Sequence, residues 1–148
     1  MRSFKLLTAT AFALLTMVFL ESPIPSHAQE PRYLHALSNL RQAKGFLQWD
    51  QNPYTADARR QAVLEIENAI GDVKTAARDD GKNTNFVPPP DVRAEGGGAI
   101  RSARDLLAVA FEDVKYGYDN PMNAGLQERA KRHIIEARRI CESILHPQ

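Results

Sequence analysis

This chain of 148 residues has very little cysteine and tryptophan and almost no net charge. Cys141 and Trp49 are the only residues of their types, and 19 basic residues nearly balance 18 acidic ones. A single cysteine excludes a disulfide within one chain and a CxxCH motif for covalent haem. We expect Cys141 to be a small buried residue on the last helix, with a disulfide-linked dimer as the alternative.

Long apolar runs are absent after the N-terminus. Arg2 and Lys5 precede an apolar run over residues 6–20, and the small residues of Ser26-His27-Ala28 follow it. This order is typical of a secretory signal peptide, with cleavage predicted after Ala28. A membrane anchor is the competing interpretation, but the run is shorter than the roughly 20 residues that a spanning helix needs. We therefore expect a periplasmic or secreted protein with no membrane span after cleavage.

The mature chain, residues 29–148, has no net charge. Loss of Arg2, Lys5 and Glu21 with the signal peptide leaves 17 basic and 17 acidic residues. Nucleic acids and anionic membranes favour proteins with clustered positive charge, so neither is expected as the main partner. The length suits a single domain. The expected partner is an unidentified protein or small ligand, and the expected state is a monomer or weak homo-oligomer.

Apolar residues recur at helical spacing in four stretches of the mature chain, and no stretch alternates as a strand would. The stretches cover about residues 33–49, 55–79, 100–114 and 126–144. Asn52-Pro53 interrupts the first pair and Asn120-Pro121 the second. A polar segment over residues 81–97, containing Pro88-Pro89-Pro90, separates the two pairs. The sequence therefore predicts an all-α fold of two helical hairpins, at about residues 32–80 and 98–146.

The two predicted hairpins resemble each other. Shifting the numbering by 68 aligns Asn52-Pro53 with Asn120-Pro121 and Ile66 with Ile134, and shifting it by 67 aligns Leu47 with Val114. We interpret this as a duplicated hairpin, because one hairpin cannot bury its apolar stripe alone. The prediction is an antiparallel up-down-up-down four-helix bundle, in which both hairpin turns lie at the same end.

Aromatic residues gather near the two predicted turns. The predicted topology would bring together five of them: Phe46, Trp49, Tyr54, Tyr116 and Tyr118. Such residues often close the open end of a core, but Trp and Tyr are also enriched in binding hot spots. We predict that this end is the ligand-binding or partner-binding surface of a non-enzymatic interaction or structural protein.

Metal or cofactor binding is the alternative function. His133 flanks the apolar stripe of the last helix, and Glu65 holds the matched position in the first half, so the two side chains could form a mixed site. Dinuclear carboxylate bundles use Glu-x-x-His on two helices, which this chain lacks. Asp79 and Asp80 precede Gly81 as in part of a calcium loop, but the alternating acidic ligands of an EF-hand are missing. The bundle resembles cytochrome b562 in outline only, because two converging axial donors for haem are missing. We expect no cofactor.

Residue sets for catalysis are also missing. Ser102 and Ser143 have no His and Asp nearby, and Gly96-Gly97-Gly98 is not followed by the Lys-Ser/Thr of a phosphate-binding loop. Glu65 and Glu67 are two residues apart on a helix and so point in different directions. We expect that the protein is not an enzyme.

Two segments carry a resemblance to a protein family. Residues 65–74 with 79–83, and residues 33–41, resemble an uncharacterised family of exported bacterial helical proteins, and the similarity extends over most of the mature chain. The shared residues lie at helix seams and helix ends. The resemblance therefore implies an exported helical fold, and it implies no activity, cofactor or site residue.

Overall fold

The structure is a computed structural model that describes residues 32–85, 98–117 and 120–147. Within these ranges all regular structure is helical and no strand is present, which confirms the predicted all-α class. None of the described helices is long and apolar enough to cross a membrane. The predicted signal peptide, most of the predicted crossover and Tyr118 lie outside the described residues.

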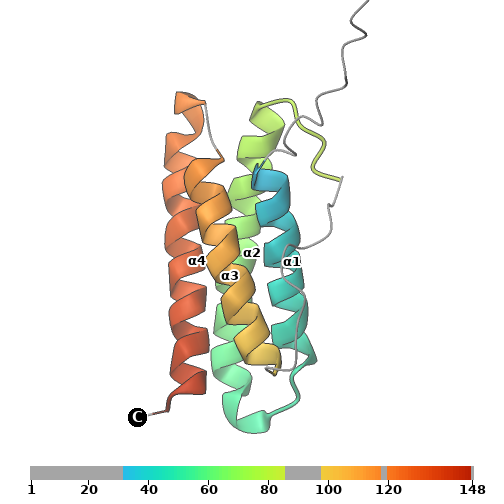
Figure 1. The fold of residues 1–148 in the computed structure, drawn as a ribbon, viewed down its shortest axis with the longest axis vertical. Helices are drawn as coiled ribbons and strands as arrows, with labels where there is room; N and C mark the ends of the chain where they lie inside the picture. Colours follow the sequence, from blue (N-terminus) through green and yellow to red (C-terminus); the bar gives the residue numbers. More distant parts are fainter. Residues whose placement is uncertain (1–31, 86–97, 118–119, 148) are drawn as a thin grey trace, which may run out of the picture.

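Four long helices and two short 3-10 turns make up the described chain (Figure 1). The elements in order are α1 (Arg32–Trp49), η1 (Pro53–Thr55), α2 (Ala56–Asp79), α3 (Ala99–Tyr116), η2 (Pro121–Asn123) and α4 (Ala124–Leu145). These bounds agree closely with the stretches of helical periodicity in the sequence. Local apolar spacing and the Asn-Pro interruptions were therefore enough to place the helices.

The helix ends have local causes. Asn52 and Asn120 each accept a hydrogen bond from the backbone N–H two residues later, at 3.0 Å, and a proline follows each asparagine. These are the contacts by which asparagine caps a helical turn. Gly81, with φ of +70°, ends α2, and Lys82 N–H donates to the Ala77 carbonyl at 2.9 Å. A positive φ there favours glycine over residues with a Cβ.

The core is one cluster that draws on all four helices. Its large members are fully buried: Leu37, Leu40, Leu47, Ile66, Val73, Leu106, Leu107, Val114 and Ile134. Many remaining core positions are alanine, which allows the helix backbones to approach closely. Cys141 is buried in this cluster, as predicted.

The direction of α3 differs from the prediction. In Figure 1, α1 and α4 run downward along the chain, whereas α2 and α3 both run upward. α1 packs against α2 and α3, and α4 packs against the same two helices, so every packed pair is antiparallel. The order is therefore down-up-up-down, and the predicted up-down-up-down topology is wrong.

The two hairpin turns consequently lie at opposite ends of the bundle (Figure 1). Asn123, next to the α3–α4 turn, donates to the carbonyl of Ala76 near the end of α2, at 3.3 Å. At the other end, Trp49 and Ala99 line a common hollow. Residues 80–98 can extend to about 60 Å, roughly twice the ~27 Å length of an 18-residue helix. The apolar stripes fix which faces are buried, and a linker of this length permits either direction of α3.

Candidate functional site

The most exposed large apolar side chains near the α1–α2 turn are Trp49 and Tyr54. Trp49 is the last residue of α1 and is 75% exposed, and Tyr54 in η1 is 97% exposed. Phe46, one turn before Trp49, is partly buried against the core. Phe46, Trp49 and Tyr54 all lie at the end of the bundle that holds the α1–α2 turn, which we call the α1–α2 end. Three of the five predicted binding residues therefore share one end.

The other predicted members lie elsewhere. Tyr116 is at the end of α3, at the opposite end of the bundle, and Tyr118 lies outside the described residues. The Tyr116 ring lies 4.6 Å from the ammonium of Lys115 and 5.6 Å from the guanidinium of Arg32, within the range of cation–π contacts. The prediction that Tyr116 joins Trp49 and Tyr54 is wrong, because it depended on the topology that placed both turns together.

Three surface hollows surround the last turns of α1. A groove of about 600 Å³ runs between α1 and α2, and its lining includes Leu47, Val63 and Leu64. A second hollow of about 400 Å³ lies beside Trp49 at the end of the bundle. A third, of about 240 Å³, lies on the outer face of α1 and includes Gly45, Phe46 and Trp49. We call the first the α1–α2 groove. Leu64 is 55% exposed there, so the groove has an accessible apolar wall.

Arg59 holds the α1–α2 turn in place. Its Nη1 donates to the carbonyls of Leu47, at 2.9 Å, and Asp50, and its Nη2 donates to the carbonyl of Asn52 at 2.9 Å. Its Nε donates to Oγ1 of Thr55 at 3.1 Å. One side chain thus satisfies carbonyls at the end of α1, where helical partners are lacking. The turn between Trp49 and Tyr54 is therefore fixed by a side chain that sequence reasoning did not identify.

Gln127 makes the corresponding contacts in the second hairpin. Its Nε2 donates to the carbonyls of Val114 at 2.8 Å and Lys115 at 3.0 Å, at the end of α3. Gln127 matches Arg59 at the offset of 68, and Val114 matches Leu47 at the offset of 67. The offsets were visible in the sequence, but the polar residues that hold the turns do not stand out among other surface residues.

The basic residues around the last turns of α1 differ in whether they pair with a carboxylate. Lys44 contacts Glu67 across the groove at 3.3 Å, and Arg60 pairs with Asp57. Arg41, which lines the hollow beside Phe46 and Trp49, donates from Nη2 to the carbonyl of Thr84 at 3.1 Å, and its buried Nη1 has no hydrogen-bond partner among the described residues. Arg41 and Arg59 therefore have no carboxylate partner within the described part of the chain.

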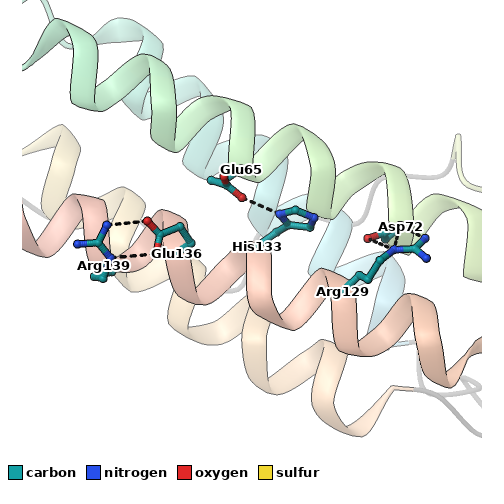
Figure 2. A network of polar contacts seen from close by, with 6 residues as sticks. All are labelled: Glu65, Asp72, Arg129, His133, Glu136 and Arg139. Carbon is teal, nitrogen blue, oxygen red and sulfur yellow. Dashed lines mark hydrogen bonds and ion pairs between the residues drawn. The ribbon is translucent and has the colours of Figure 1, made fainter.

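The structure brings Glu65 and His133 together. His133 Nδ1 lies 2.6 Å from Glu65 Oε2, between α2 and α4, and both side chains are partly buried (Figure 2). Along the same interface, Arg129 of α4 pairs with Asp72 of α2 at 2.6 Å. In the described ranges no group of three or more His, Cys, Asp or Glu side chains gathers in a metal-binding arrangement. Two ligands are fewer than zinc sites in proteins use.

Asp80 has two hydrogen-bond partners in the α3–α4 turn. Its Oδ1 accepts hydrogen bonds from Nδ2 of Asn120 at 2.9 Å and from Nδ2 of Asn123 at 3.1 Å, whereas Asp79 is exposed. Asn123 is only 1% exposed, so this connection between the end of α2 and η2 is partly buried. The Asp79-Asp80 segment therefore fastens the α3–α4 turn to α2, a contact that depends on the direction of α3.

Comparisons with protein-family models, curated proteins and solved structures give no match for this chain.

Proposed function

We propose that this protein is an exported, non-enzymatic interaction protein that binds a partner protein through the α1–α2 end. The observation that supports this proposal is the exposure of Trp49 and Tyr54 at a turn to which Arg59 makes hydrogen bonds at four residues. Large aromatic side chains on a fixed backbone provide much contact area at a low cost in conformational entropy, which is one reason they are enriched in hot spots. Export is proposed from the sequence of residues 1–28 and from the resemblance to exported helical proteins.

The chain offers an internal comparison that supports this proposal, if its two hairpins derive from a duplication. Asn52 and Asn120 cap equivalent turns, and Arg59 and Gln127 contact equivalent carbonyls. Equivalent positions of the two hairpins then have the same task in the fold. A difference in chemistry between them points to a task beyond folding.

The groove residues differ in this way. Val63 and Leu64 of the α1–α2 groove correspond to Lys131 and Arg132 of the second hairpin, and Lys131 pairs there with Glu128 at 2.6 Å. The second hairpin thus has charged side chains at positions where the first has apolar ones. Val63 also packs against the core, but Leu64 is 55% exposed. Because the fold accepts charge at the position that matches Leu64, its exposure is better explained by binding than by packing.

Site-specific photo-crosslinking in the exporting cell tests the proposal. A benzophenone amino acid replaces Trp49 or Tyr54 in two chains, and Tyr116 or Met122 in two control chains, since Met122 is also exposed, at 89%. We expect one discrete crosslinked protein from the first two positions and none from the controls. In the Tyr54 chain, Trp49→Ala should weaken that product. The proposal is wrong if positions 49 and 54 give no product, or if all four positions give the same one.

A further inference from the structure

The charges beside the α1–α2 groove identify the kind of partner segment that fits it. We infer that the groove binds an acidic amphipathic helix, an inference that rests on the proposed function. The groove lies between two antiparallel helices and has an apolar wall, which is the setting in which proteins bind the apolar face of a helix.

The apolar part of the groove has the position and size for such a helix. Val63 and Leu64 lie on α2, and Leu47 forms the buried base on α1. Its volume of about 600 Å³ holds several side chains rather than one. Two apolar residues of a partner helix, three or four positions apart, would lie on one face and enter it together.

The polar part of the site selects for negative charge. Arg59 and Arg60 line the groove, and the acidic lining residue Glu67 is paired with Lys44 at 3.3 Å. Arg59, within the described part of the chain, contacts only backbone carbonyls and the Thr55 hydroxyl, so no carboxylate there neutralises its charge. Arg60, which also lines the groove, pairs with Asp57 where both side chains are largely exposed, a weak contact.

These cations have no counterparts at the matched positions of the second hairpin. With the offset of 68, Arg59 and Arg60 correspond to Gln127 and Glu128. The groove arginines therefore lie beside apolar residues in the first hairpin, whereas the second hairpin has its cations, Lys131 and Arg132, at the positions that match Val63 and Leu64. Carboxylates on a partner helix would complement these guanidinium groups, whereas lysines would meet repulsion.

Two synthetic peptides, each about five helical turns long and labelled with fluorescein, test the inference on the mature protein. Both have leucine at the same helical positions, and glutamate fills the remaining sites in one peptide and lysine in the other. By fluorescence anisotropy we expect the acidic peptide to bind at least tenfold more tightly at low salt. The difference should shrink as salt rises, because exposed charges are screened.

Variants of the protein test where the acidic peptide binds. Val63→Lys with Leu64→Arg copies the residues that the second hairpin has, so the chain should stay folded, and we expect at least tenfold weaker binding of the acidic peptide. Arg60→Gln should weaken the acidic peptide at least threefold and leave the basic peptide unchanged. Arg132→Leu is the matched control on the second hairpin and should leave both affinities unchanged. Thermal unfolding by circular dichroism checks that each variant is folded.

Three results would overturn the inference: equal affinity for the two peptides, unchanged binding by the Val63 and Leu64 variant, or no binding of the acidic peptide up to ~1 mM. Crosslinking from positions 49 and 54 separates these failures from a failure of the proposed function. If the crosslinked partner persists while the acidic peptide shows no preference, only the kind of partner is wrong.

Discussion

Glu65 on α2 and His133 on α4 meet at 2.6 Å, although 68 positions separate them in the chain. The same interval separates Asn52 from Asn120, the caps of the two turns. Glu65 and His133 are therefore matched residues at this sequence offset. Their contact joins α2 of the first hairpin to α4 of the second (Figure 2).

This contact should stabilise the packing of one hairpin on the other. We expect Glu65→Gln and His133→Ala each to lower the free energy of unfolding by about 1 kcal/mol. A double-mutant cycle by urea unfolding should give a coupling of about 0.5 to 1 kcal/mol. The pair Glu136 and Arg139, both on α4 and exposed to solvent, is the control and should couple more weakly. A rise in Tm on adding zinc, abolished by His133→Ala, would instead support the metal-binding alternative.

The two capping asparagines should differ in their effect on stability. Both accept a backbone hydrogen bond, but only Asn120 also donates to Asp80. We expect Asn52→Ala to cost about 0.5 to 1 kcal/mol and Asn120→Ala about 1 to 2 kcal/mol, measured by chemical denaturation. In an Asp80→Asn background the difference should become smaller. Equal costs in the natural background would show that the contact with Asp80 adds no stability.

Two helical glycines give a test that separates folding from binding. A Cβ added at Gly45 or Gly71 would meet no atom within 4 Å, so alanine fits at both positions. Alanine should raise the free energy of unfolding by about 0.5 to 1 kcal/mol at each, because glycine has more freedom to lose. Gly45 lines the hollow beside Phe46 and Trp49, whereas Gly71 is distant in α2. We therefore expect Gly45→Ala alone to reduce crosslinking from position 54. Reduced crosslinking by both variants would contradict a role for Gly45 in partner contact.

Cys141 should be inert in the folded protein. Burial raises the pKa of its thiol to about 12, so the thiolate fraction at pH 8 is on the order of 10⁻⁴. We expect a thiol-specific chromogenic reagent to react only at the rate of unfolding, and rapidly in denaturant. Fast modification of the folded chain, or a disulfide-linked dimer on a non-reducing gel, would contradict this.

The same thiol predicts a dependence of stability on pH. Its pKa in the folded chain lies above the ordinary value of 9.0, so its contribution is fully present below pH 9. The contribution falls by up to about 1.4 kcal/mol per pH unit between 9 and 12, because only the unfolded chain then ionises. Cys141→Ala should remove this part of the slope in urea unfolding. An unchanged slope would show that the thiol does not titrate as its burial indicates.

The sequence allowed the four helices and their core faces to be predicted because these depend on local patterns. Apolar spacing identified core residues such as Ile66 and Ile134, and Asn-Pro pairs identified the turns. The offsets of 67 and 68 also placed Glu65 opposite His133 as matched residues. None of these inferences required knowledge of how the helices are directed.

The tertiary structure decided the direction of α3 and everything that follows from it. That direction separates Tyr116 from Trp49, and it brings Asp80 to Asn123. It depends on how the side faces of four helices pack together and on a linker long enough to reach either end. By itself, the sequence determined which residues are helical and which faces are buried, since neighbouring residues fix both. Which ends meet, and hence which side chains share a surface, was decided only by contacts between residues far apart in the chain.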